Sequence, residues 1–106
     1  MPSNRKGENF SGNLRPVFLD MAIKPIRLSG HALSYSLQRG FTIEQVETAI
    51  RGAHWEPVEQ GRFECRKDFP FGQEWNGKVY SCKQVRPIFV VEENEIVVVT
   101  VYVYYY

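Results

Sequence analysis

The sequence predicts an α+β domain in which two short N-terminal helices pack on one face of an antiparallel sheet of about four strands. Two features of the apolar residues lead to this prediction. Between residues 29 and 52 they recur every three or four positions, as on one side of a helix, and from residue 53 onward they alternate, as on one face of a strand. Helices this short are not stable alone, so they need the sheet as a packing partner.

The chain of 106 residues is long enough for one domain. Residues 1–22 are polar, contain glycine and lack periodicity, so we expect a flexible N-terminal arm followed by the domain over residues 23–106. Met21, near the end of this arm, offers a second start site for a shorter product.

The first predicted helix has a signal at each end. Ser29 is suited to cap its N-terminus, and Gly40 is suited to the left-handed position that ends a helix. Leu33 and Leu37 lie four residues apart, on one side of this helix, and Leu28 can pack on Leu33 ahead of it. We therefore expect the two leucines to face inward.

The second predicted helix is bounded by a capping box and a glycine. Thr42 and Gln45 are placed to bond each other's backbone N–H groups, and Gly52 ends the helix. The expected inward stripe consists of Val46, Ala49 and Ile50.

Turn residues divide the rest of the chain into strands. We expect strands at "HWEPVE" and "RFECRKDF" around the turn "EQG", a hairpin turn at Asn76–Gly77, a long strand "KVYSCKQVRPIFVV", the turn "EEN" and a final strand. Pro87 lacks a backbone N–H, so its position in the long strand must face an edge or a bulge.

The final strand, "EIVVVTVYVYYY", has two different faces. The odd-numbered valines, Val97, Val99, Val101 and Val103, are expected to lie beneath the helices. A three-residue loop at "EEN" would place Arg86 opposite Thr100 and Gln84 opposite Tyr102 on the other face. A two-residue loop would pair Arg86 with a core valine and bury its charge, so we prefer the first register.

Composition excludes several classes of function. The net charge is only +1, Cys65 and Cys82 do not fit a zinc site or a disulfide framework, and phosphate-binding loops and serine-hydrolase elbows are missing from the sequence. The longest apolar run, 11 residues from Ile96, is shorter than the roughly 20 residues of a spanning helix. We expect a cytoplasmic protein without a membrane segment, a metal or a cofactor.

His31 and Arg86 are the strongest candidates for chemistry. His31, near the start of the first helix, is suited to act as a general base or acid, although a histidine at a helix start often has no role. Arg86 lies in an apolar context, and with Thr100 and Tyr102 it would form a surface that holds a phosphate.

Other residues are candidates for binding. Arg39 closes the first helix, where its charge also has a purely structural use. Tyr35, Trp75 or one of the terminal tyrosines is suited to stack on a base, and Lys67 belongs to a group of basic residues in the predicted sheet. The roles of Tyr104, Tyr105 and Tyr106 stay open between a stacking surface and an association edge.

Three segments, "SGHALSYSLQRGFTIEQVETAI", "GRFECRK" and "RPIFVVEENEIVVVTVY", resemble the domain of unknown function 4258 family over roughly residues 26–102. The resemblance implies a small bacterial or phage α+β domain, likened to the RelE/barnase-type ribonuclease toxins, in which His31, Arg39 and Thr100 match family positions. Arg86 lies near a basic position of that family. The aromatic segment at residues 68–77 and the terminal tyrosines depart from its pattern.

Two functions are therefore predicted. The first is a metal-independent endoribonuclease of the toxin class, in which His31 transfers protons and Arg86 stabilises phosphate charge, with RNA and an antitoxin protein as partners. The alternative is a non-catalytic interaction module that associates with a partner or a second copy through its last strand. A protein in which none of these polar residues has a functional role is a third alternative.

Overall fold

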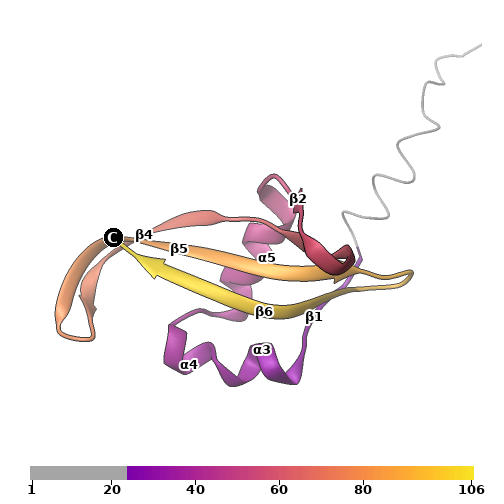
Figure 1. Cartoon of the computed structure of the whole chain (residues 1–106). Helices are drawn as coiled ribbons and strands as arrows, with labels where there is room; N and C mark the ends of the chain where they lie inside the picture. The colour runs from indigo at the N-terminus through magenta and orange to yellow at the C-terminus, as the bar shows by residue number, and fades with distance from the viewer. Residues whose placement is uncertain (1–23) are drawn as a thin grey trace, which may run out of the picture.

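The computed structural model describes residues 24–106 (Figure 1). The predicted arm over residues 1–22 and the second start site at Met21 lie outside the described residues. The described chain is an α+β domain of three short α-helices followed by most of a six-stranded mixed sheet, which is mostly antiparallel. The fold class is confirmed, with one helix and two strands more than we predicted.

The elements, in chain order, are β1 (Ile26–Leu28), α3 (Gly30–Ser34), α4 (Ser36–Arg39), α5 (Ile43–Gly52), β2 (Glu56–Pro57), a 3₁₀ turn (Glu59–Gly61), β3 (Phe63–Glu64), β4 (Lys67–Trp75), β5 (Lys78–Val91) and β6 (Ile96–Tyr105). The strand order is β1-β6-β5-β3-β2, and β4 also pairs with β5. Only β1 and β6 are parallel; the other described pairs are antiparallel.

The first predicted helix is split into α3 and α4 at Tyr35, whose backbone is not helical. Its ends are as predicted, because the Ser29 side chain accepts a hydrogen bond from the backbone of Ala32 and Gly40 is left-handed. The inward leucines are a wrong prediction, since Leu33 is 44% and Leu37 is 92% exposed.

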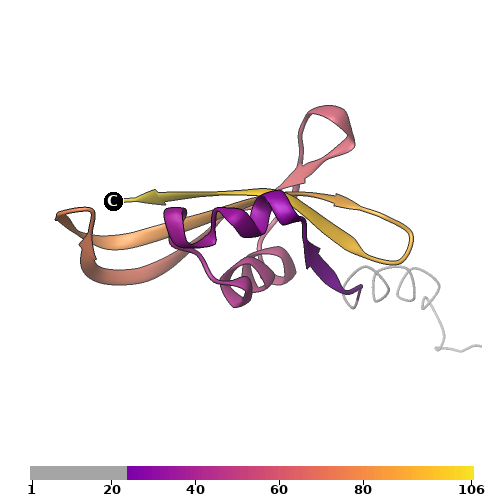
Figure 2. The same cartoon turned by 90° about the horizontal axis from the view of Figure 1, so that it is seen from below.

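The split helix packs along an edge of the sheet instead of across its face (Figures 1 and 2). The backbone N–H of Ser29 donates to Val98 O at 2.9 Å, and its hydroxyl donates to Val99 O at 3.2 Å. So close an approach leaves room only for a small side chain, and Ala32 is the residue of α3 that is buried. The leucines consequently point outward.

Helix α5 follows the prediction closely. The capping box is formed by Thr42 and Gln45, and the buried residues of the helix are Val46, Ala49 and Ile50. Figure 2 shows α5 beneath the sheet, so one face of the sheet is covered and the fold has two layers.

The β4–β5 hairpin turns at Asn76 and Gly77, which both have left-handed backbones with φ of 53° and 87°. Trp75 pairs with Lys78 across this two-residue turn, as predicted. Strand β4 is longer than expected and is irregular between Pro70 and Gln73. The hairpin curls toward the side of the sheet on which α4 lies (Figure 1).

The predicted register between β5 and β6 is wrong. Val91 pairs with Ile96, so the loop has four residues, and Val99 is an extra residue between the pairs Phe89–Val98 and Ile88–Thr100. These two changes shift the pairing by two residues, which keeps Arg86 on the same face of the sheet. Arg86 lies opposite Tyr102, and Gln84 lies opposite Tyr104.

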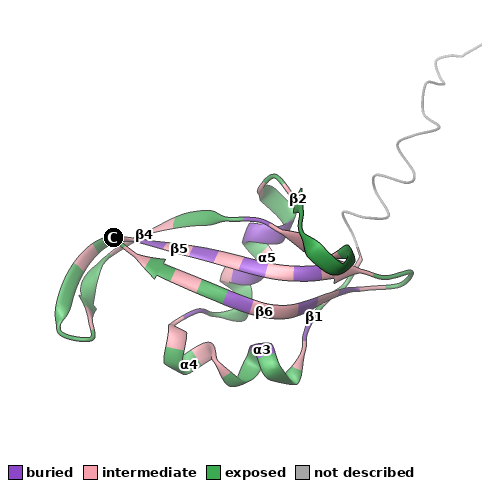
Figure 3. Cartoon of the chain, viewed as in Figure 1, coloured by how far each residue is buried: buried purple, intermediate pink, exposed green. Residues whose placement is uncertain are grey.

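The bulge at Val99 also changes which residues of β6 are buried. Ile96 and Val98 are buried before it, and Val101 is buried after it (Figure 3). The predicted valine face is therefore right for Val101, which is buried, and for Val103, which packs against the core. It is wrong for Val97 and Val99. An extra residue reverses the alternation of side chains along a strand.

The core lies between α5 and the sheet and includes a group of three rings, Trp55, Phe63 and Phe89. Pro87 lies in β5 where the ladder changes from β3 to β4, and its carbonyl accepts a hydrogen bond from Cys65 N. The missing N–H thus falls at a break in pairing, in keeping with the predicted edge or bulge. Within residues 24–106, none of the helices is long and apolar enough to cross a membrane.

We expect Gly40→Ala to destabilise the domain by about 2 kcal/mol or more. Gly40 has φ of +82°, and a Cβ there would lie 2.7 Å from Trp75 Cη2 and even closer to Tyr105 Oη. The matched control is Gly52→Ala at the end of α5, where a Cβ meets nothing within 4 Å. The control should be neutral or slightly stabilising in denaturant unfolding. Equal midpoints for the two variants would contradict this packing.

The two cysteines should differ in reactivity toward a thiol reagent. Burial raises the pKa of the Cys65 thiol from 9.0 to about 12, whereas Cys82 is only half-buried. We expect Cys82 to be labelled in the native protein at pH 8, and Cys65 only after unfolding. The Cys65 thiol ionises at a lower pH in the unfolded chain than in the folded chain, because its pKa is raised only in the folded state. The contribution of Cys65 to stability should therefore decrease as the pH rises from 9 to 12. Equal labelling rates, followed by mass spectrometry, would refute the assignment.

Candidate functional site

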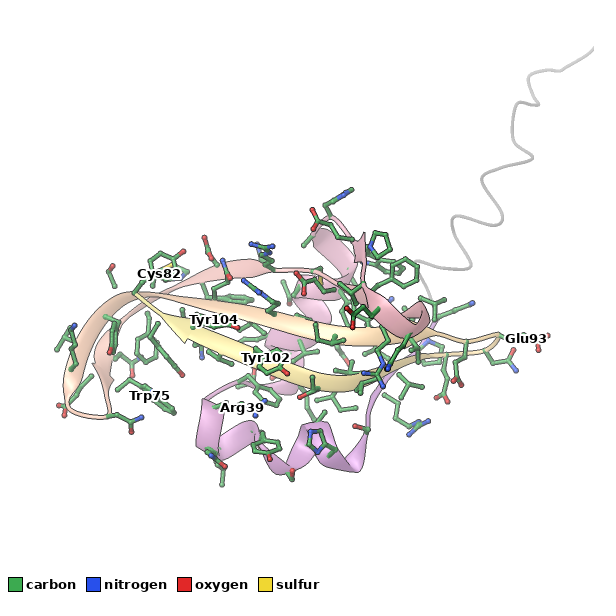
Figure 4. The ribbon with its side chains drawn as sticks, in the orientation of Figure 1. Arg39, Trp75, Cys82, Glu93, Tyr102 and Tyr104 are labelled. Atoms are coloured by element: carbon green, nitrogen blue, oxygen red, sulfur yellow. The ribbon has the colours of Figure 1, made fainter. Side chains whose placement is uncertain are left out.

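The sheet has an open face on the side opposite α5. Successive side chains of β5 and β6 point to opposite faces of the sheet. One set is buried on the side of α5, and the residues between them point to the open face. The open face includes Gln84, Arg86, Ile88, Thr100, Tyr102 and Tyr104. Figure 4 is viewed toward this face, and Tyr102 and Tyr104 are 43% and 46% exposed.

Arg39, the last residue of α4, lies between two tyrosine rings beside the edge of β6 (Figure 4). Its guanidinium carbon is 3.9 Å from the ring centre of Tyr35 and 5.2 Å from that of Tyr102. Nη1 donates to Val101 O at 2.8 Å and more weakly to Thr100 Oγ1 at 3.4 Å. Cation–π contacts and hydrogen bonds thus fix the guanidinium at the border of the open face.

The position of Arg39 depends on two side chains that bond the C-terminal end of α4. Tyr105 Oη donates to Arg39 O at 2.8 Å, and Lys83 Nζ donates to Gly40 O at 2.7 Å. Lys83 is 7% exposed, and this burial lowers its pKa. The ring of Tyr105 in turn stacks on Trp75 at 4.9 Å, so the curled hairpin supports the end of the helix.

His31 lies on the exposed surface of α3 and joins the same group of side chains. Its ring contacts the edge of Tyr35, with 5.1 Å between the ring centres. His31, Tyr35, Arg39 and Tyr102 therefore form a continuous series of contacts, which we call the His–Arg row. It offers one imidazole, one fixed cation and two phenol rings.

Arg86 lies next to this row on the open face but contacts a different tyrosine. Its guanidinium carbon is 4.8 Å from the ring centre of Tyr104, and Nη2 donates to Gln84 Oε1 at 3.3 Å. The Nε atom is buried and has no hydrogen-bond partner in the described structure. Gln84 is itself held by Asp68, whose Oδ1 accepts its amide at 3.0 Å.

The structure brings together most of the residues selected from the sequence, in a different arrangement. Thr100 contacts Arg39 and not Arg86, whose partner is Tyr104. Lys67 lies apart from the row: it pairs with Val85 in the β4–β5 ladder, and its Nζ is 5.7 Å from the ring centre of Phe69. The contact between Arg39 and β6 was missed because it joins residues 61 and 62 positions apart.

The outer edge of β6 is largely occupied by α3 and α4. Ser29 bonds the carbonyls of Val98 and Val99, and Arg39 bonds that of Val101. A second chain that paired with this edge would have to displace these contacts. The outer edge of β4 carries Pro70 and an irregular segment, features that commonly prevent pairing.

Two shallow pockets are lined by residues 54–68 and by residues of β5, and neither lining includes a residue of the His–Arg row. One of about 290 Å³ is lined by His54, Glu56, Glu64, Cys65, Arg66, Asp68 and Gln84. The other, of about 410 Å³, is lined by Val58, Glu59, Gln60, Arg62 and Ile88. Among residues 24–106, no three histidine, cysteine or acidic side chains gather in the way that a metal ion needs.

Comparisons with protein-family models, with curated proteins and with solved structures find no match for this chain.

Replacing Arg39 by methionine should cost about 1–3 kcal/mol of stability, because Val101 O loses its donor and two cation–π contacts disappear. Arg66→Met is the control, since Arg66 is half-exposed and makes a single long ion pair of 3.5 Å with Glu64. Its loss should be below about 1 kcal/mol. Urea unfolding monitored by tryptophan fluorescence would measure both, and similar losses would argue against a fixed Arg39.

Proposed function

We propose that this domain binds single-stranded RNA at the His–Arg row and cleaves it as a small, metal-independent endoribonuclease of the toxin class in the cytoplasm. The observation that supports this most directly is the guanidinium of Arg39, fixed between two tyrosines, with an exposed histidine on the same series of rings. The row has a cation for the phosphate, aromatic rings for a base and a histidine for proton transfer. The resemblance to the domain of unknown function 4258 family stays a prediction from the sequence, because no family model matches the chain.

Arg39 is suited to bind the phosphate. Among the guanidinium nitrogens of Arg39, only Nη1 makes hydrogen bonds within residues 24–106. The other guanidinium N–H groups are therefore available for phosphate oxygens. A cation fixed in advance stabilises the charge that develops on phosphorus during cleavage without rearranging. In this proposal Arg39 takes the role that the sequence assigned to Arg86, and Thr100 orients it.

His31 would serve as the general base. It removes the proton from a ribose 2′-hydroxyl, whose oxygen bonds to the adjacent phosphorus while the bond from phosphorus to the 5′-oxygen breaks. The leaving 5′-oxygen takes a proton from water, and His31 returns its proton to solvent. The products are a 2′,3′-cyclic phosphate and a 5′-hydroxyl end. Tyr35 and Tyr102 would stack on the flanking bases.

The net charge of +1 implies modest affinity for RNA, because counterion release contributes little. Recognition would then depend on stacking and on a few local cations. The toxin class also implies an antitoxin protein as a partner.

The alternative is a non-catalytic interaction module that uses the last strand. Tyr102, Tyr104 and Tyr106 are all exposed, which gives this strand an aromatic surface suited to a protein partner. Sedimentation would detect self-association. A dimer that is lost on Tyr104→Ala, together with RNA that the wild type leaves uncleaved, would favour this function.

Cleavage is tested with the purified chain, EDTA and a labelled single-stranded RNA of mixed sequence. We expect products with 2′,3′-cyclic phosphate ends and no cleavage of the DNA of the same sequence, which lacks the attacking hydroxyl. His31→Gln should slow cleavage by about 10²–10⁴-fold.

The matched control is His54→Gln, the other histidine of the chain, which is also exposed and lines the 290 Å³ pocket. It should cleave like the wild type. Intact RNA with the wild-type protein, or equal rates for the two histidine variants at equal stability, would refute the proposed chemistry.

A further inference from the structure

The arrangement of an arginine on a tyrosine occurs twice along β6. Arg39 lies on the ring of Tyr102. Arg86 lies on the ring of Tyr104, which follows Tyr102 by two residues in β6, with 4.8 Å between the guanidinium carbon and the ring centre. Both tyrosines point to the open face and both are nearly half-exposed. The second pair is not used by the cleavage step described above.

Arg86 is not neutralised by the protein around it. No carboxylate lies within ion-pair distance of Arg86 in the described part of the chain, and its one hydrogen bond, to Gln84, is long at 3.3 Å. Its Nε is buried without a partner. A partly buried cation without a counter-charge is costly, so an anion that binds the guanidinium of Arg86 would reduce this cost.

The second pair is spaced as a neighbouring unit of the first. A strand rises about 3.3 Å per residue, so the rings of Tyr102 and Tyr104 are attached about 6.6 Å apart along β6. Consecutive bases of an extended single strand can stack on rings in such a series, and every base can use the face of a ring or of a guanidinium.

We propose that Tyr104 and Arg86 form a second nucleotide subsite, which binds the base and the phosphate of the nucleotide next to the one at the His–Arg row. Gln84 orients Arg86 and is anchored by Asp68. The ligand is single-stranded nucleic acid of at least two nucleotides that runs along β6 across the open face. The inference rests on the proposed function for the identity of the first subsite.

Binding is measured by fluorescence anisotropy with uncleavable 2′-O-methyl oligonucleotides of one to six nucleotides. We expect affinity to increase steeply from one to two nucleotides. Tyr104→Leu should weaken binding of the longer probes by about 5- to 150-fold, the factor that corresponds to a stacked base, and Tyr104→Phe should restore it. Neither change should affect binding of the mononucleotide.

Arg86→Met should reduce the slope of log affinity against log salt concentration by about 0.7, as expected when one phosphate contact to a single strand is lost. A purely structural role of Arg86 would leave this slope unchanged. Arg66→Met serves as the control for an arginine outside the two subsites, and Arg86→Gln, which also removes the charge, replaces Arg86→Met if the latter does not fold.

The outcomes separate the two proposals. If the wild type cleaves RNA while the Tyr104 and Arg86 variants bind and cleave like it, the second subsite is refuted and the nuclease stands. If the wild type binds the probes with the expected dependence on length and variant but never cleaves RNA, the nuclease is refuted and the subsite stands. If the probes do not bind at all, the subsite is refuted.

Discussion

The β-bulge at Val99 determines which side chains of the last strand reach the core and which reach solvent. Before it, Ile96 and Val98 are buried; after it, Val101 is buried and Val103 is half-buried against the core. Without the extra residue, Tyr102 and Tyr104 would lie beneath α5, where their hydroxyls would need buried partners. The bulge therefore creates the aromatic open face and places Arg86 on the same side.

The features that were predicted correctly are local. The caps at Ser29 and Thr42, the left-handed Gly40 and the turn at Asn76–Gly77 each depend on residues within a few positions of one another. Their geometry is set by backbone preferences and short hydrogen bonds, which the sequence displays directly.

The features that were missed depend on distant parts of the chain. The register of β5 and β6 follows from a four-residue loop and a bulge, and a bulge leaves no fixed sequence signal when it contains valine. The outward leucines follow from the docking of α3 on the edge of β6, which pattern within the helix cannot reveal. The candidate site shows the same division. Its residues were recognised by type, whereas the contact of Arg39 with Thr100 required the tertiary structure.

The support of Arg39 has a consequence for when this surface can form during synthesis. The groups that fix α4 come from Thr100, Val101 and Tyr105, which follow Arg39 by 61, 62 and 66 positions. A nascent chain on the ribosome carries His31, Tyr35 and Arg39 long before these partners emerge from the exit tunnel. The complete row can therefore assemble only after Tyr105 has left the ribosome, so an incomplete chain exposes neither the fixed cation nor the aromatic face.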